Sequence, residues 1–185
     1  MREAIATFRI DHHRTETVLV SGDVLWVDDS KATNPHAAEA ALLAFDPIVW
    51  VVGGLLKGVD VDELVERNVE RLRAAVIIGV DRLALRSAFE RHAPALPVFE
   101  VDETDTEQVM PQVVRLAAAA ALPGDTVLLA PAAASMDQFD SYSDRGRRFQ
   151  SAVREFTTTN RPGGAAHDDD TQPGQERGTT AGATP

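Results

Sequence analysis

Three short segments of this 185-residue chain carry residues that could bind an anionic ligand. The first loop, residues 28–35, has the sequence DDSKATNP; the second loop, residues 53–58, is GGLLKG; the third loop, residues 130–139, is APAAASMDQF. Each loop follows an apolar run of strand length. In open parallel sheets, ligands bind just outside the carboxyl ends of the strands. If the three preceding strands run parallel, the loops share one rim of the sheet, and that rim is the predicted site.

The side chains in these loops are of the types that hold carboxylates and phosphates. The first loop ends at a predicted helix start, where free backbone N–H groups favour an anion. Lys31 adds a mobile positive charge there, Asp29 an acceptor and Thr33 a hydroxyl. The second loop places glycines beside Lys57, and glycine lets backbone approach a ligand closely. In the third loop, Ser135 could donate a hydrogen bond to a ligand carboxylate.

Each loop also has an ordinary structural explanation. The first could be a capped helix with a solvated lysine, the second a strand-to-helix turn, and the third a helix cap. The patterns G-x-G-x-x-G and G-x-x-x-x-G-K-[ST] of nucleotide-binding loops occur nowhere in the 185 residues, and neither does the G-x-S-x-G of serine hydrolases. The spacing of residues within any one loop therefore leaves both interpretations open.

Lysine and histidine usage adds two observations. Only Lys31 and Lys57 are lysines among the 18 basic residues, and both lie in these loops. Their ammonium groups are compact and flexible where the guanidinium of arginine is planar, so a required role is one explanation and chance is the other. The histidines show no metal-ligand spacing such as H-E-x-x-H, so no metal site is predicted. They are His12, His13, His36, His92 and His167, and the first two are expected on a polar linker.

Composition narrows the class of protein. The net charge of −11 argues against nucleic acid or an anionic membrane as the main partner. No apolar run approaches the roughly 20 residues that span a bilayer, and the first residues lack the apolar core of a signal peptide. There are no cysteines, which excludes disulfides and thiolate catalysis. These features suit a cytoplasmic protein.

Apolar runs of strand length alternate with helical patterns along the chain, which predicts a parallel sheet covered on both faces. The predicted fold class is α/β: a doubly wound, mostly parallel open sheet, Rossmann-like, with an N-terminal β-hairpin and a disordered C-terminal tail. We expect a linker over residues 1–14, a domain over 15–156 and the tail over 157–185, which has too few large apolar residues to offset chain entropy. The predicted strands are 17–20, 24–27, 47–52, 74–78, 97–101 and 126–129; the predicted helices are 35–45, 60–72, 81–92, 110–121 and 141–156, with Asn34, Asp60 and Asp81 as caps and Pro111 in a first turn.

Taken together, the three loops resemble the C-terminal domain of the Mur ligase family, and specifically of its D-glutamate-adding members. The matching patterns are DSKATN, then GG-x-x-K, then LLSPACASxDxF followed by RG, in the same order over roughly residues 8–156. Some positions depart from the family. Leu55 and Leu56 replace Asp-Gly, Ala130 and Ala133 replace Ser and Cys, and Tyr142 stands where Phe is usual.

The resemblance implies a cytoplasmic, ATP-dependent ligase of peptidoglycan synthesis. In that family ATP phosphorylates the carboxylate of UDP-N-acetylmuramoyl-L-alanine, and the amino group of D-glutamate attacks the acyl phosphate. The implied cofactors are ATP and Mg²⁺, the latter held mainly by a central domain from which residues 1–14 would be a linker remnant. Carried over residue by residue, the resemblance implies that ATP is bound by Arg14, Asp29, Lys31 and Thr33. It implies that D-glutamate is bound by Thr33, Lys57, Ser135, Met136 and Tyr142, and that Lys31 is the catalytic residue.

The absence of a P-loop pattern leaves further hypotheses. The chain alone is expected to be inactive, and a separate chain carrying the missing domains is a candidate partner. Alternatively, it is a non-catalytic module that binds nucleotide or amino acid or docks on a partner. A third reading is a related Mur ligase or folylpolyglutamate-type enzyme that adds a different amino acid.

Overall fold

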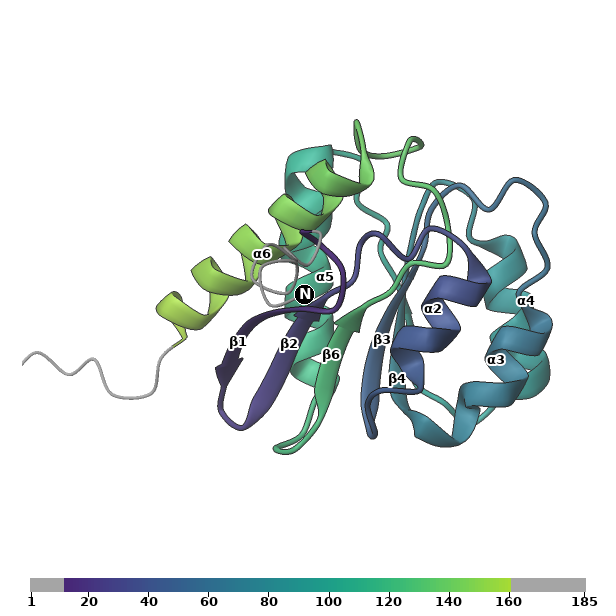
Figure 1. Ribbon diagram of the computed structural model, residues 1–185, viewed down its shortest axis with the longest axis horizontal. Coiled ribbons are helices and arrows are strands. Elements are labelled where there is room, and N and C mark those ends of the chain that lie inside the picture. Colours follow the sequence, from purple (N-terminus) through teal and green to yellow (C-terminus); the bar gives the residue numbers. More distant parts are fainter. Residues whose placement is uncertain (1–11, 161–185) are drawn as a thin grey trace, which may run out of the picture.

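The computed structural model describes residues 12–160, which form a six-stranded sheet with helices on both faces (Figure 1). The strand order is β1-β2-β6-β3-β4-β5; β1 and β2 form an antiparallel hairpin, and every other neighbouring pair is parallel. The predicted α/β fold class, with its mostly parallel sheet and N-terminal hairpin, is therefore confirmed. The strands are β1 (Glu16–Ser21), β2 (Val24–Asp28), β3 (Ile48–Gly53), β4 (Leu72–Ile78), β5 (Val98–Glu100) and β6 (Thr126–Leu129). The helices are α2 (Pro35–Leu42), α3 (Asp62–Asn68), the short η1 (Val69–Arg71), α4 (Leu83–His92), α5 (Thr106–Ala120) and α6 (Tyr142–Thr159).

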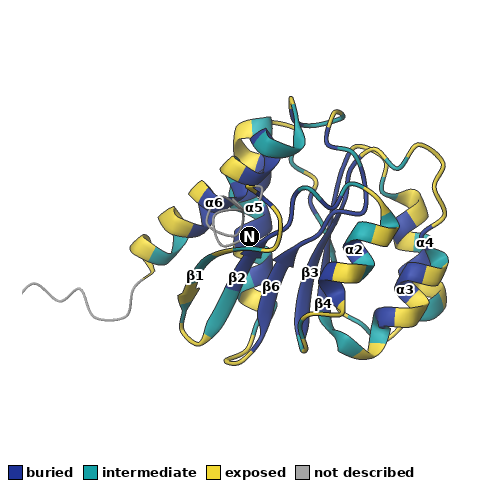
Figure 2. Ribbon diagram, viewed as in Figure 1, coloured by how far each residue is buried: buried dark blue, intermediate teal, exposed yellow. Residues whose placement is uncertain are grey.

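The core lies on the two faces of the sheet. Helices α2, α3 and α4 pack on one face and α5 and α6 on the other. Alternate residues of β3 point to opposite sides, so Trp50 packs with the first group of helices and Val51 with the second. The central strands are buried while the outer surfaces of the helices are exposed (Figure 2). A sheet covered in this way leaves the ends of its strands as the place for polar loops.

The three loops leave the same edge of this sheet. Strand β6 pairs in parallel with β2 on one side and with β3 on the other. The loops that follow these three strands are the first, third and second loops defined above, in that spatial order. The geometric premise of the predicted site is thereby confirmed. Gly53, at the end of β3, fits there because a Cβ atom would lie 2.1 Å from the carbonyl oxygen of Ile78.

Helix α5 begins earlier than predicted. Its first residue is Thr106, and the side chain of Asp105 caps it by accepting the N–H of Glu107 at 3.0 Å. Pro111 consequently lies inside the helix and not in its first turn, so that prediction is wrong. The first turn of α5 is polar and has no apolar repeat. The hydrophobic pattern of the sequence therefore gives no signal for the true start of the helix.

Other element boundaries also differ. Helix α2 ends at Leu42, short of residue 45. Asp60 and Asp81 each accept a backbone N–H two residues on, but they do not occupy the cap position itself, which belongs to Val61 and Arg82. Helix α6 runs to Thr159, three residues beyond its predicted end at residue 156 and into the predicted tail. The rest of the predicted tail, from residue 161, and residues 1–11 of the predicted linker lie outside the described residues.

Among residues 12–160, no helix combines the length and apolar character that crossing a membrane requires.

Replacing Pro111 with alanine should stabilise the protein. Proline in a helix interior costs about 3 kcal/mol because it removes one hydrogen bond and crowds the preceding turn, and the loss of its rigidity from the unfolded chain gives back up to about 1 kcal/mol. We expect Pro111→Ala to raise the free energy of unfolding in urea by about 2 kcal/mol. Pro123→Ala, outside any helix, is the control; equal effects of the two substitutions would contradict the prediction.

Candidate functional site

Backbone hydrogen bonds join the three loops to one another. The N–H of Ala132 donates to the carbonyl of Ala32 at 2.9 Å, which ties the third loop to the first. Leu55 and Ala134 exchange two hydrogen bonds, of 2.8 and 3.2 Å, as an isolated antiparallel bridge between the second and third loops. Lys57 lies two residues beyond one side of this bridge and Ser135 next to the other. The bridge therefore fixes the backbone at Lys57 relative to the backbone at Ser135.

A buried arginine lies beneath the first and third loops. Arg145, in the first turn of α6, donates from Nε to Ser30 Oγ at 2.9 Å and from Nη2 to the Ser30 carbonyl at 2.9 Å. Both of its Nη atoms also donate to the carbonyl of Ala133 at 3.2 Å. Ser30 Oγ in turn donates to the carbonyl of Tyr142 at 2.7 Å. The guanidinium thus holds the two loops and the start of α6 together.

The charge of Arg145 is kept in the interior at a cost. Burial lowers the pKa of Arg145 to about 10, against the opposing effect of the nearby charges of Asp137 and Asp28. The guanidinium donates to a hydroxyl and two carbonyls, all of which are neutral. In the sequence this arginine belongs to the RG pattern, from which no role for it was predicted. A single arginine on a helix carries no local signal that it is buried.

The third loop is also fastened to the end of β4. The Gly79 N–H donates to Gln138 Oε1 at 2.7 Å, and the Val80 N–H donates to Asp137 Oδ2 at 3.0 Å. Thr106 Oγ1, at the start of α5, donates to the carbonyl of Gln138 at 2.9 Å. The segment SMDQF therefore reaches from β6 across β3 to β4, and its side chains are anchors for the loop as much as candidate ligand contacts.

The first loop holds Asp29 in an unusual setting. Asp29 is buried, and its Oδ1 accepts the N–H of Thr15 at 3.2 Å. Burial raises the pKa of Asp29 above its ordinary value, although the Thr15 hydrogen bond and the charge of Arg14 oppose the change. Asn34 caps α2 through the N–H of Ala37 at 3.0 Å, as predicted. In the first loop, burial thus disfavours the ionised form of Asp29, which lies near the capped start of α2.

Lys31 and Tyr142 are brought together from opposite ends of the chain. The Lys31 ammonium nitrogen lies 5.7 Å from the centre of the Tyr142 ring, a distance at which a cation is attracted to the ring face. Tyr142 also lines an open hollow of about 590 Å³ with His13, Glu16 and Arg147. Thr33 is half-buried in the same loop as Lys31.

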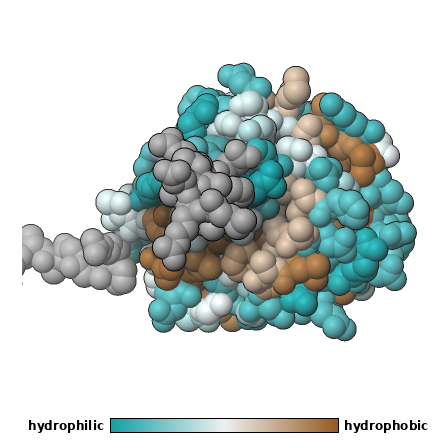
Figure 3. Space-filling model, in the orientation of Figure 1, coloured by the Kyte–Doolittle hydropathy of each residue, from teal (hydrophilic) through white to brown (hydrophobic). Residues whose placement is uncertain are grey.

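Lys57 lies by a second hollow, of about 490 Å³, which Gly54, Val80 and Asp137 also line. Its backbone φ of 55° is in the left-handed region, which costs a non-glycine residue on the order of 1 kcal/mol or more. Apolar side chains stand around this hollow, and on the face of the molecule seen in Figure 3 apolar patches likewise interrupt a largely hydrophilic surface. A cation held in a strained conformation beside a hollow is a good candidate ligand contact.

The predicted D-glutamate residues differ in accessibility. Met136 is 72% exposed and Lys57 is exposed, whereas Ser135 is only 3% exposed. The Ser135 carbonyl accepts the N–H groups of Gln138 and Phe139, so this serine also closes a turn within the third loop. These residues lie at one edge of the sheet, but Lys57 lines one hollow and Tyr142 lines the other.

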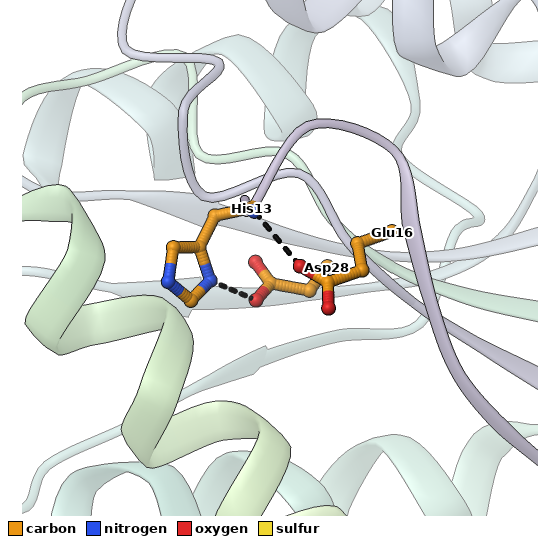
Figure 4. A group of neighbouring side chains, drawn as sticks. All are labelled: His13, Glu16 and Asp28. Carbon is orange, nitrogen blue, oxygen red and sulfur yellow. Dashed lines mark hydrogen bonds and ion pairs between the residues drawn. The ribbon is translucent and has the colours of Figure 1, made fainter. Parts of the chain in front are cut away.

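The N-terminal turn, residues 12–15, departs from the polar linker that was predicted. His13 is 7% exposed and its Nδ1 lies 2.6 Å from Asp28 Oδ2, at the end of β2 (Figure 4). One ligand atom from each of His13, Glu16 and Asp28 lies within 4.8 Å of the others, a spacing that a metal ion could use. However, Asp28 Oδ2 also accepts from Gln150 at 2.8 Å and Oδ1 from the Ser30 N–H at 2.9 Å. Because hydrogen bonds already engage these oxygens, we interpret the group as a buried His–Asp pair.

Fold and site together define an α/β domain with a mostly parallel sheet and with hydrogen-bonded loops at the carboxyl edge of that sheet. Residues 13–133 match the glutamate ligase domain of the Mur ligases. The chain belongs to the Mur ligase family, as the sequence resemblance predicted. Two solved Mur ligases share the fold: UDP-N-acetylmuramate-alanine ligase MurC of Thermotoga maritima, with a TM-score of 0.52 and 14% identity over 85% of this chain, and MurF of Acinetobacter baumannii, with a TM-score of 0.55 and 17% identity over 83%. Each alignment covers 33% of the solved chain.

Relatives of higher identity carry a more specific name. The chain is 62% identical over 168 residues to the UDP-N-acetylmuramoylalanine–D-glutamate ligase of Leifsonia xyli, and 52% identical over 154 residues to that of Streptomyces avermitilis. These alignments cover 91% and 83% of this chain, but 32% and 33% of the relatives. The chain thus spans about a third of the length of these relatives.

Asp29→Asn should make the protein more stable at neutral pH. Because the folded-state pKa of Asp29 is raised, ionising the group favours the unfolded chain, and wild-type stability falls as the pH rises through that pKa. Asparagine keeps the acceptor for Thr15 without this penalty. We expect a higher midpoint of thermal unfolding for the variant at pH 7, with the difference vanishing below the ordinary aspartate pKa of about 3.9. A difference that grows on acidification would contradict the assigned cause.

Proposed function

We propose that this chain forms the amino-acid-binding part of an ATP-dependent ligase that adds D-glutamate to UDP-N-acetylmuramoyl-L-alanine in peptidoglycan synthesis, in the cytoplasm. The observation that carries the proposal is the 62% identity to a ligase of that name over 91% of this chain. The interlocked loops add physical support, because they bring cations and donors from three distant segments to one edge.

D-Glutamate brings two carboxylates that need partners. The Lys57 ammonium beside its hollow is suited to one of them, since charge-assisted hydrogen bonds to carboxylates are the strong ones. Thr33 and Ser135 offer hydroxyl donors, and Met136 and Tyr142 offer apolar surface for the carbon chain between the carboxylates. The bridge between Leu55 and Ala134 fixes the backbone at Lys57 relative to Ser135. These contacts would therefore select ligands by the distance between their two carboxylates.

The nucleotide would meet the other side of the first loop. Arg14 and Lys31 supply positive charge for the phosphates, Asp29 an acceptor for a hydroxyl group, and Thr33 a hydroxyl donor. The backbone at Lys31 lies close to the backbone at Arg14, because the Lys31 N–H donates to the carbonyl of His13, the residue before Arg14, at 3.0 Å. Bound Mg²⁺ would neutralise phosphate charge. We place its ligands mainly outside this chain, because the hydrogen bonds to Asp28 occupy the one group with metal-like spacing among residues 12–160.

In the proposed reaction, the nitrogen of D-glutamate bonds to the carbonyl carbon of the acyl phosphate. The C–O bond to phosphate breaks, phosphate leaves with the electron pair, and the nitrogen gives up a proton. Lys31 would act as the catalytic residue, since a cation beside the phosphoryl oxygens stabilises the charge that develops on them. Lys57 and Ser135 would hold the amino acid so that its nitrogen faces the carbonyl, which removes the entropy cost of alignment.

A second candidate function is a binding module without chemistry of its own. The absence of a P-loop pattern from the 185 residues favours it. Such a module would hold nucleotide or amino acid through the same loops, or dock on a separate chain that carries the ATP-cleaving domain.

Lys57→Gln should weaken D-glutamate binding. Loss of one charge-assisted hydrogen bond, worth about 1.5–3 kcal/mol, corresponds to a rise in Kd of about 10- to 150-fold. NMR titration of the labelled chain with D-glutamate would measure it, with L-lysine and meso-diaminopimelate as competing candidates. Arg115→Gln, an exposed cation on α5, is the control. Stronger binding of a competing amino acid would reject D-glutamate as the substrate.

The 185-residue polypeptide by itself should not release ADP from ATP-Mg in the presence of D-glutamate and UDP-N-acetylmuramoyl-L-alanine. The physical reason is that no segment matches the loop that cradles ATP phosphates in P-loop enzymes. A coupled ADP assay measures it, with a full-length relative as the positive control. Release of ADP at a rate comparable to that control would contradict the prediction that the chain by itself does not cleave ATP.

A further inference from the structure

The turn that carries Arg14 is held in a costly conformation. Its neighbours His13 and Thr15 have φ of 63° and 45°, both in the left-handed region that residues with a Cβ avoid. Two such residues on either side of one arginine cost on the order of 1–3 kcal/mol each, so the surroundings must hold the turn in place. Arg14 itself is exposed.

The ring of His13 is the buried anchor of this turn. Its Nδ1 lies 2.6 Å from Oδ2 of Asp28, a residue with no exposed surface at the end of β2 (Figure 4). The carboxylate is itself fixed by Gln150 from α6 and by the Ser30 N–H. A group held by three donors from three segments has little freedom to move, and so it gives the histidine a fixed partner.

Hydrogen bonds made by backbone groups also hold the chain on both sides of Arg14. The His13 N–H donates to Glu16 at 2.9 Å, and its carbonyl accepts the Lys31 N–H at 3.0 Å. Beyond the arginine, the Thr15 N–H donates to Asp29 at 3.2 Å. The turn is therefore fastened to the first loop before and after Arg14.

Helix α6 leaves room for the His–Asp pair only through a glycine. A Cβ atom on Gly146 would lie 2.3 Å from His13 Nδ1 and 2.8 Å from Asp28 Oδ2. The adjacent Arg145 holds the first loop from its other side. The two residues of the RG pattern thus act on the same loop, one as a donor and the other by leaving space.

We propose that His13 and Asp28 are positioning residues, which set the turn of residues 12–15 so that Arg14 meets the phosphates of the nucleotide beside Lys31. This rests on the proposed function for the identity of the ligand. The role is separable from the Lys57 contact with D-glutamate, because the second loop and its hollow involve neither residue. Loss of the pair should loosen the turn and weaken nucleotide binding while leaving amino-acid binding intact.

The test compares His13→Gln with His12→Gln, which changes the adjacent and exposed histidine in the same way. In the wild-type chain and in the control, ¹⁵N relaxation should give amide order parameters of about 0.85 for Arg14 and Thr15; in His13→Gln they should fall below about 0.6. The Kd for ATP-Mg should rise by about tenfold, a factor set by about 1.4 kcal/mol, with the Kd for D-glutamate unchanged. A merely structural role would raise both constants together.

Asp28→Asn serves if His13→Gln fails to fold. It keeps the shape of the side chain but offers one oxygen to three donors, so we expect the same selective loosening of the turn. Rigid Arg14 and Thr15 amides in either folded variant, or equal losses for both ligands, would overturn the inference. A wild-type chain that binds no ATP-Mg would instead count against the proposed function, while the order parameters still decide whether His13 fixes the turn.

Discussion

The guanidinium of Arg145 lies out of contact with water between Ser30 and the carbonyl of Ala133, and the relative position of the first and third loops depends on it. Burying a charge without a direct carboxylate partner is expensive, which its lowered pKa reflects. The planar fork of donors reaches a hydroxyl and two carbonyls at once, which a lysine could not do. The domain tolerates this cost because the same contacts join two loops more than a hundred residues apart in sequence.

The apolar sheet forms the core, and its parallel strands determine where the loops lie. The sheet could be predicted because its strands are short runs of β-branched residues such as 48–52, and a run of this kind is stable only when both faces are covered. Parallel order then places the following loops on one edge, which is why the sites of Lys31 and Lys57 could be anticipated. The start of α5 at Thr106 could not, because its polar first turn carries no hydrophobic period.

What the sequence could not predict is how the loops are joined. The bonds of Ala132 to Ala32 and of Leu55 to Ala134 link backbone groups of residues some 80 to 100 positions apart, and backbone groups are the same in every residue. Burial of His13 was hidden for a related reason. A histidine after a linker is usually solvated, and only the end of β2 and the glycine of α6 create the space that encloses it.

The strain of the backbone is concentrated where the ligands would bind. Within residues 12–160, five non-glycine residues have positive φ; His13, Thr15, Lys57 and Ala132 belong to the N-terminal turn or the loops of the site, and only Asp23 lies in the hairpin turn at the opposite end of its strands. The acid with a raised pKa, Asp29, lies in the same region. A chain selected for stability alone would have relaxed these positions, since a glycine or asparagine relieves such strain at little cost. Backbone strain of this kind clusters at ligand-binding sites, so its position at one edge of a well-packed sheet supports the proposal that the ligands bind there.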